Sequence, residues 1–266
     1  MHDIIVAAIL GIVQGLTEFL PVSSSGHLII ASALLGEDNA RIDTFAVVIQ
    51  FGSILAVVML YWRRFMGLLR PDGRAFSGLR GLYLLFLTSL PASLVGLFAH
   101  KAIKTYLFNP TSVALALVAG GIAMLIVERK NRNGEVVSID GMTPGMALGI
   151  GVCQCCSLWP GFSRSASTIM GGMLLGARRD VAAEYSFIAA VPIMFAATFF
   201  DLYKSLSFLK ANDIPFFLFG MGVSFVVALL AIKVFVGLLG RISLRPFAWY
   251  RLAIAPLVYW ALQFMS

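Results

Sequence analysis

Residues 14–27 of this 266-residue chain read QGLTEFLPVSSSGH, and residues 160–168 read PGFSRSAST. Each stretch interrupts an apolar region with proline, serines and an ionisable side chain, and the apolar pieces on either side are shorter than the roughly 20 residues that a bilayer-spanning helix needs. Irregular backbone at membrane depth is tolerated only where it lines protein or a wet cavity. The two polar breaks therefore predict two re-entrant helical hairpins, over residues 4–36 and 143–176.

The rest of the chain is dominated by apolar stretches long enough, or nearly so, to cross a membrane. Apolar residues make up 59% of the sequence and charged residues 12%, where about 25% is usual in soluble proteins. This composition excludes a water-soluble enzyme and a disordered chain. We predict an all-α, polytopic integral membrane protein, with residues 1–266 forming one membrane domain. Six full crossings are expected, at 44–62, 82–99, 111–127, 184–203, 215–238 and 247–265.

The two halves of the chain resemble each other around the breaks. A shift of 140 residues aligns Gly11–Gly36 with Gly151–Gly176, with 8 of 26 positions identical and the polar breaks coinciding. We therefore expect two repeats, over residues 1–128 and 143–266, each with one hairpin and three crossings. Because three is odd, the second repeat would be inverted relative to the first, which is the arrangement that places sites at the membrane midplane.

The basic residues are distributed unequally between the two predicted sides. Under the six-crossing topology one side carries thirteen Lys or Arg residues and the other carries five. The positive-inside rule makes the first side cytoplasmic, so that both termini and the first hairpin lie outside. The net charge of +7 is then a topology signal, and no nucleic-acid partner is expected. The thirteen are Arg63, Arg64, Arg70, Arg74, Arg80, Arg129, Lys130, Arg132, Arg178, Arg179, Arg241, Arg245 and Arg251, and the five are Arg41, Lys101, Lys104, Lys204 and Lys210.

Three further patterns bear on processing and assembly. Cysteines occur only at 153, 155 and 156, a spacing that favours helix packing over a disulfide framework or a zinc site. No cleavable signal peptide is expected, because Asp3 precedes the first apolar stretch and no basic region does. The Gly120-Gly121 pair would allow close helix approach, and with it a homodimer, without specifying a partner.

Ionisable groups within the membrane are functional candidates, and here they are Glu18, His27 and Arg164. Gln14 and Glu18 are four residues apart and share one helix face. Each break also precedes a new helix, whose N-terminus carries unpaired N–H groups and a partial positive charge. Two such termini and the Arg164 guanidinium would bind a multiply charged anion, most naturally a phosphate or diphosphate.

Simpler interpretations remain beside this one. Glu18 and Arg164 could form only a structural ion pair between the hairpins, and His27 could be a hydrogen-bonded core residue. An inverted repeat with broken helices is also the architecture of a secondary transporter, so the same pocket could carry a lipid phosphate across the membrane as a flippase. A purely structural scaffold would leave the buried polar breaks without a purpose.

The two breaks also carry a resemblance to a known family. QGLTEFLPVSSSGH and PGFSRSAST, with the AAEYSF stretch that ends at Phe187, closely resemble the signature motifs of the bacterial undecaprenyl-diphosphate phosphatase family, also called the bacitracin resistance protein. The resemblance covers essentially the whole chain. The first acidic position of the family's Glu/Gln-x-x-x-Glu pattern is Gln14 here, which leaves Glu18 as the sole acid of the pair.

The resemblance implies an enzyme of the bacterial cytoplasmic (inner) membrane, with its site open to the outer, periplasmic side. The family hydrolyses undecaprenyl diphosphate to undecaprenyl phosphate and inorganic phosphate, which recycles the lipid carrier for peptidoglycan and envelope polysaccharide synthesis and confers bacitracin resistance. The implied partners are this polyprenyl diphosphate lipid and the surrounding membrane lipids. A dependence on Mg²⁺ or Ca²⁺ is also implied, and Glu18 is the only plausible carboxylate ligand.

The mechanism that we expect uses residues of both breaks. Ser24 is the leading candidate for the nucleophile, Glu18 or His27 would take its proton, and Arg164 would stabilise the developing charge. In a rival version His27 itself is the nucleophile. The remaining site residues are expected to bind substrate or orient water, and these are Gln14, Ser23, Ser25, Ser163, Ser165 and Thr168.

Overall fold

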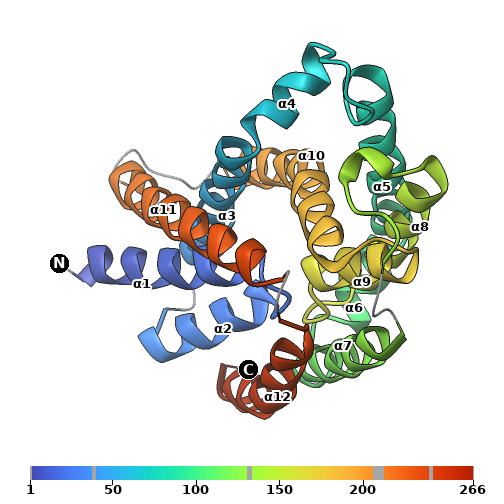
Figure 1. Cartoon of the computed structure of the whole chain (residues 1–266). Helices are drawn as coiled ribbons and strands as arrows, with labels where there is room; N and C mark the ends of the chain where they lie inside the picture. The colour runs from blue at the N-terminus through green and yellow to red at the C-terminus, as the bar shows by residue number, and fades with distance from the viewer. Residues whose placement is uncertain (1, 38–39, 131–133, 206–212, 240–241, 266) are drawn as a thin grey trace.

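Helices joined by short connections make up almost all of the chain, as the composition predicts (Figure 1). The structure is a computed structural model, and it describes residues 2–37, 40–130, 134–205, 213–239 and 242–265. Within these ranges lie twelve α-helices, two short 3₁₀ helices and one isolated bridge between Val136 and Ala177. The helices are α1 (His2–Thr17), α2 (Ser24–Leu35), α3 (Ala40–Leu60), α4 (Trp62–Leu69), α5 (Gly78–Phe98), α6 (His100–Tyr106), α7 (Pro110–Lys130), η1 (Ile139–Gly141), α8 (Pro144–Gln154), η2 (Cys155–Leu158), α9 (Arg164–Leu174), α10 (Arg179–Ser205), α11 (Ile214–Leu239) and α12 (Arg245–Met265).

Five of these helices are long and apolar enough to cross a membrane, so the chain is a polytopic membrane protein. They are α3, α5, α7, α10 and α11, and they confirm five of the six predicted spans. The sixth predicted span lies in α12, which has 21 residues, but Arg251 and Gln263 lower its hydropathy and it does not join the five. At about 1.5 Å per residue α12 is long enough to cross, and its crossing stays a prediction.

Both predicted hairpins form as two short helices around a break. Helices α1 and α2 pack against each other, and so do α8 and α9. Pro21 lies in the first break, and Pro160 lies in the second break, after the 3₁₀ turn η2. At the far end of the first hairpin Gly36 adopts a left-handed conformation (φ 69°), and its N–H and that of the next residue satisfy carbonyls at the end of α2.

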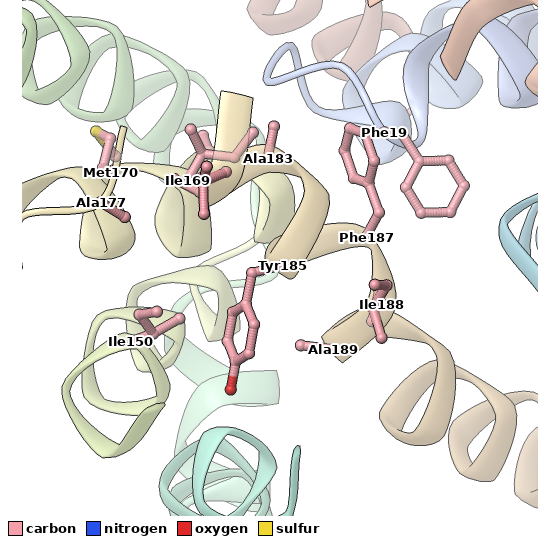
Figure 2. Close-up of a cluster of buried hydrophobic side chains, with 14 of the residues drawn as sticks. Phe19, Ile150, Ile169, Met170, Ala177, Ala183, Tyr185, Phe187, Ile188 and Ala189 are labelled. Carbon is pink, nitrogen blue, oxygen red and sulfur yellow. The ribbon is translucent and has the colours of Figure 1, made fainter. Parts of the chain in front are cut away.

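The first break is fixed in the hydrophobic core by an aromatic side chain. Phe19 is almost fully buried and meets Phe187 of α10 edge to face, with ring centroids 5.2 Å apart (Figure 2). The same core cluster continues along α10 through Tyr185 to Ile169 and Met170 of α9. Because α10 contacts both breaks, it sets the distance between them.

The second break also depends on a glycine that no other residue can replace without strain. Gly161 has φ +95°, and a Cβ at this position would lie 2.5 Å from the carbonyl oxygen of Val113. Gly176 has nearly the same φ, +94°, with nothing within 4 Å of its virtual Cβ. The two glycines therefore separate the cost of a positive φ from the cost of a steric clash.

We expect Gly161→Ala to destabilise the protein more than Gly176→Ala does. Both substitutions place an L-residue at positive φ, at a cost of about 1–2 kcal/mol, but only Gly161→Ala adds a clash with backbone that must move. Thermal unfolding of the detergent-solubilised variants measures the difference. Equal shifts in the two midpoints would contradict the packing described for Gly161.

Candidate active site

The two breaks share an unusual backbone conformation at matching positions. Ser23 (φ 73°) and Ser163 (φ 78°) are the only non-glycine residues with positive φ in the described part of the chain, and they lie 140 residues apart. Each directly precedes the first residue of a helix, Ser24 of α2 or Arg164 of α9. Such a conformation costs on the order of 1–3 kcal/mol and is concentrated at functional sites. In both breaks it presents the next side chain at a helix N-terminus.

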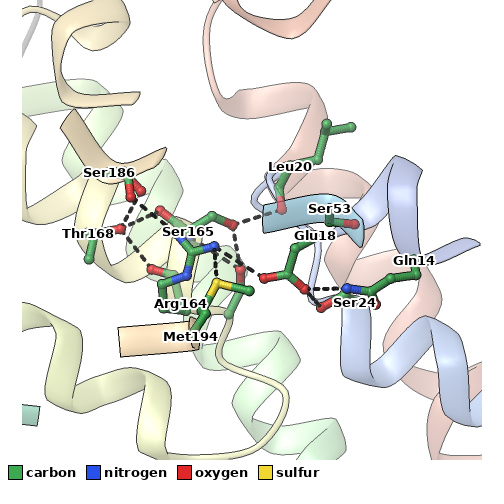
Figure 3. A network of polar contacts seen from close by, with 12 residues as sticks. Gln14, Glu18, Leu20, Ser24, Ser53, Arg164, Ser165, Thr168, Ser186 and Met194 are labelled. Atoms are coloured by element: carbon green, nitrogen blue, oxygen red, sulfur yellow. Dashed lines mark hydrogen bonds and ion pairs between the residues drawn. The ribbon is translucent and has the colours of Figure 1, made fainter. Parts of the chain in front are cut away.

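The side chains that follow these serines meet at one carboxylate. Glu18, 8% exposed, accepts hydrogen bonds at Oε2 from Ser24 Oγ (2.8 Å) and Gln14 Nε2 (2.9 Å), and at Oε1 from Arg164 Nη2 (3.2 Å) (Figure 3). We call these four residues the polar cluster. It confirms the predicted shared face of Gln14 and Glu18, and also the ion pair between the hairpins.

Within the polar cluster Ser24 has the geometry of an activated nucleophile. Its hydroxyl donates to a carboxylate at 2.8 Å, within the range in which a general base takes a proton. Ser24 is half-buried and begins helix α2, so the N-terminal N–H groups of that helix lie beside it. Ser23 and Ser25 instead hydrogen-bond each other through their hydroxyls at 3.2 Å. The structure thus singles out Ser24 among the three serines.

Arg164 keeps unused hydrogen-bonding capacity at the polar cluster. Its Nη1 donates to the carbonyl of Ser186 (3.3 Å) and its Nη2 also contacts Met194 Sδ (3.3 Å). Its buried Nε has no hydrogen-bond partner among the described residues. The guanidinium also lies 5.4 Å from the centroid of the Phe19 ring. Beside its ion pair with Glu18, Arg164 therefore has a donor that a further acceptor could use.

Two predicted substrate-binding residues, Ser165 and Thr168, make hydrogen bonds within the protein. Ser165 Oγ donates to the carbonyl of Leu20 in the first break (2.9 Å). Thr168 Oγ1 bonds Ser186 Oγ at 2.6 Å and the Arg164 carbonyl at 2.9 Å. Both side chains are 1% exposed. They join the second break to the first break and to α10, and so they hold Arg164 in position (Figure 3).

Ser163 has both a capping and a bridging role at the start of α9. Its Oγ accepts from the N–H of Ala166 (3.3 Å) and bonds Ser165 Oγ at 3.0 Å. The Ser163–Ser165 contact joins residues two apart in sequence, as the Ser23–Ser25 contact does in the first break. This predicted binding residue therefore shapes the turn that carries Arg164.

His27 lies apart from the polar cluster. Its Nδ1 is 2.8 Å from the carbonyl oxygen of Ser23, and its Nε2 is 2.6 Å from the hydroxyl of Tyr250, whose ring is stacked on it. Since a carbonyl only accepts, Nδ1 carries the proton, and Nε2 of the neutral ring accepts from Tyr250. His27 is thus hydrogen-bonded at both ring nitrogens, as the simpler interpretation has it, but it is half-buried and not a core residue. No sequence pattern indicated Tyr250, which lies in α12.

One of the charge assignments made from the sequence is wrong. Arg251 was placed in a cytoplasmic loop, but it lies in α12 and is fully buried. Its guanidinium donates to the carbonyls of Ala116 and Leu117 in α7, of Pro21 in the first break and of Gly161 in the second. The room for it comes from Gly120, where a Cβ would lie 2.2 Å from Nη2. Arg251 thus links both breaks to α7.

Glu128, in the last turn of α7, is another buried charged residue. It is 4% exposed, pairs with Arg179 and accepts from the N–H of Leu244 at 3.1 Å. Buried or largely buried charged side chains therefore include Glu128 and Arg251 as well as the predicted Glu18 and Arg164. Three other residues in the charge prediction, Arg132, Lys210 and Arg241, lie outside the described residues.

The residues of the polar cluster do not fit a divalent cation held by protein alone. Mg²⁺ and Ca²⁺ prefer several oxygen ligands, usually with more than one carboxylate. Glu18 is the single carboxylate here, and it already accepts from Arg164, Ser24 and Gln14. No group of three or more His, Cys, Asp or Glu side chains in the described ranges is arranged to hold a metal. We derive no step through a metal.

Fold and site together define a polytopic helical membrane protein in which a serine, a carboxylate and a guanidinium meet in one largely buried cluster. Comparison with known proteins is more specific: the sequence matches the family described as bacitracin resistance protein BacA over residues 7–257. The chain belongs to this family, which confirms the resemblance noted in the two breaks.

Relatives of this chain are similar over nearly their whole length. An undecaprenyl-diphosphatase of Nitratidesulfovibrio vulgaris is 62% identical over 265 residues, covering 99% of this chain and 100% of the relative. One of Desulfovibrio desulfuricans is 63% identical, covering 98% of both chains. One of Lawsonia intracellularis is 55% identical, covering 97% of this chain and 98% of the relative.

Proposed function

We propose that this protein is an undecaprenyl-diphosphatase, which hydrolyses undecaprenyl diphosphate to undecaprenyl phosphate and inorganic phosphate. The observation that carries the proposal is the Ser24 hydroxyl bonded to the Glu18 carboxylate, with Arg164 on the other carboxylate oxygen. The names of three relatives at 55–63% identity support the same activity. Hydrolysis would recycle the lipid carrier for envelope synthesis and confer resistance to bacitracin.

The first step transfers the terminal phosphoryl group to Ser24. Its Oγ attacks the terminal phosphorus, its proton passes to Glu18, and the bond to the bridging oxygen breaks to release the lipid monophosphate. Arg164 stabilises the charge on the transferring group, for which its buried Nε is free of other partners among the described residues. Glu18 gives the Ser24 proton to the leaving lipid phosphate and is again a carboxylate. In the second step water attacks the phosphoserine while Glu18 takes a proton from the water, the bond between phosphorus and Ser24 Oγ breaks, Glu18 returns the proton to Oγ, and inorganic phosphate leaves.

His27 acts in this scheme by positioning the first break. Its two ring nitrogens are engaged by Ser23 and Tyr250, so it fixes the strained residue that precedes Ser24. This arrangement favours Ser24 over His27 as the nucleophile, and Glu18 over His27 as the base. A Mg²⁺ or Ca²⁺ ion, if the reaction requires one, would be held mainly by the substrate phosphates, because Glu18 is the one carboxylate of the polar cluster.

An inverted repeat and an outward-facing site complete the proposal. The similar φ angles of Ser23 and Ser163, and the positive φ of both Gly36 and Gly176, support two related halves. With Arg251 removed from the count, twelve basic residues face five, which still makes the richer side cytoplasmic. We place the protein in the bacterial cytoplasmic membrane with its site open to the outer side.

An apolar groove suits the long polyprenyl tail. It has a volume of about 340 Å³ and is formed by α3, α10 and α11, including Phe51 and Thr198. Thr198 lies one helical turn beyond Met194, the α10 residue that contacts Arg164. A lipid with its diphosphate at the polar cluster could therefore leave sideways along this groove, which explains why a phosphatase site is built inside a membrane protein.

Phosphate release by the purified protein tests the proposed function. We expect wild-type protein in detergent to release phosphate from undecaprenyl diphosphate, and Arg164→Ala to be slower by about 10²–10³-fold, as for loss of one transition-state donor. Arg63→Ala, which removes an exposed arginine in α4, is the matched control and should retain wild-type turnover. Binding of the lipid without any phosphate release would contradict the enzyme and favour a lipid-phosphate flippase.

A further inference from the structure

A second pocket lies beside the polar cluster and has no role in the mechanism above. It has a volume of about 550 Å³, within the usual range for small-ligand sites. Its wall includes Ser25 of the first break, Ser157 and Pro160 of the second, and His100 and Lys104 of α6. The pocket thus lies where the two breaks face helix α6. None of the proposed catalytic residues belongs to α6.

The pocket adjoins the reacting groups without including them. Ser25 directly follows Ser24, and its hydroxyl bonds that of Ser23 at 3.2 Å. Pro160 lies at the start of the break that ends at Arg164. Neither Glu18, Ser24 nor Arg164 lines the pocket. A group in this pocket would therefore be close to the polar cluster yet outside it.

The charge of the pocket wall favours an anion. His100 and Lys104 are four residues apart on α6 and so share one helix face, and no Asp or Glu is among the residues that line the pocket. The hydroxyls of Ser25 and Ser157 add neutral donors. A concave wall that carries the Lys104 ammonium and no carboxylate concentrates phosphate-bearing ligands, and the His100 ring adds a further N–H donor. Lys101, on the same helix, is exposed but does not line the pocket.

We propose that this pocket is a second phosphate-binding site, held chiefly by Lys104 and His100, on the path between the polar cluster and the outer face. The ligand is a phosphate group, either on the head of the arriving lipid diphosphate or as the inorganic phosphate that leaves. The proposal rests on the proposed function, because that reaction brings both species to the breaks. If the pocket binds the arriving lipid, it affects the KM for the lipid. If it binds the leaving phosphate, it affects the inhibition constant for inorganic phosphate.

Steady-state phosphate release by purified Lys104→Ala and His100→Ala/Lys104→Ala tests the proposal, with Lys101→Ala as the matched control. Loss of a charged contact to phosphate is expected to weaken binding about tenfold, with turnover at saturating substrate within about twofold of wild type, because the polar cluster is intact. A raised KM for the lipid with unchanged inhibition by phosphate identifies an entry site. A raised inhibition constant for inorganic phosphate with unchanged KM identifies an exit site.

The proposal is overturned if neither constant changes in the double variant, or if Lys101→Ala changes them as much as Lys104→Ala does. Failure of the proposed function has a different signature, namely no phosphate release by the wild-type protein. In that event, equilibrium binding of radiolabelled inorganic phosphate to wild type and Lys104→Ala decides the question. Weaker binding by the variant supports the site, and equal binding contradicts it.

Discussion

Replacing Ser24 with Ala and Glu18 with Gln is expected to lower turnover by at least about 10³-fold and by about 10²–10⁴-fold, respectively. The double variant should be no slower than the slower single variant. In the proposed mechanism Ser24 and Glu18 act as one unit, since the carboxylate would take the proton from the hydroxyl that it contacts at 2.8 Å. Removing either group removes the same step, so the two losses do not add.

Glu18→Gln tests the proton transfer more specifically than Ser24→Ala does. A glutamine has nearly the same shape and can still accept from Ser24 or Arg164, but it cannot take a proton. It also leaves Arg164 without its anionic partner, so the fold is tested separately by thermal unfolding. Ser89→Ala is the matched control, because it removes a hydroxyl that bonds only within its own helix, to the carbonyl of Leu85.

Phosphate release from undecaprenyl diphosphate at saturating substrate is the measurement for these variants. A Glu18→Gln protein with a third or more of wild-type turnover would contradict the role of general base. Losses that multiply in the double variant would contradict the proton transfer between Ser24 and Glu18, because independent contributions add in free energy.

Arg251→Ala is expected to be the most destabilising single change away from the polar cluster. It would leave the carbonyls of Pro21 and Gly161 in the two breaks without their buried donor, and each such group costs about 1–3 kcal/mol when unsatisfied. The carbonyls of Ala116 and Leu117 would lose a second donor but keep their partners within α7. We therefore expect a loss of about 3 kcal/mol or more, and also a fall in turnover, since the carbonyls of Pro21 and Gly161 would no longer be held together.

The matched control for this prediction is Arg245→Ala, which removes an exposed arginine from the same helix. Arg251→Lys keeps the charge but cannot reach carbonyls on three segments, so it should fall between wild type and Arg251→Ala. Thermal unfolding in detergent and phosphate release are measured on the same samples. An Arg251→Ala midpoint equal to that of Arg245→Ala would contradict the bridging role.

The sequence was sufficient to locate the breaks and the groups that meet there. Proline and serine within apolar stretches predicted two hairpins, and the four-residue spacing of Gln14 and Glu18 predicted their contact. The rarity of intramembrane charge indicated Glu18 and Arg164, and the structure pairs them at 3.2 Å. The breaks and the Gln14–Glu18 contact are local in sequence. The pairing of Glu18 with Arg164 follows from the free-energy cost of an unpaired charge in a membrane, so all of these features can be predicted from sequence patterns.

Other parts of the site could not be read in this way. Ser24 was the leading candidate among three serines, but its hydrogen bond to Glu18 and the positive φ of the preceding Ser23 have no sequence signature. Tyr250 meets His27 across 223 residues of sequence. The partners of Arg251 are backbone carbonyls, which have no sequence signature, although one signal was present: Arg251 lies inside the predicted span 247–265 and should not have been counted in a loop.

The central claim is that Ser24 attacks the terminal phosphorus at the polar cluster. Rapid acid quench of the wild-type protein with undecaprenyl diphosphate labelled in its terminal phosphate, followed by peptide mapping by mass spectrometry, tests this claim most directly. We predict a phosphoserine at Ser24 that is absent from Ser24→Ala. Label on His27, or phosphate release by Ser24→Ala at the wild-type rate, would contradict it.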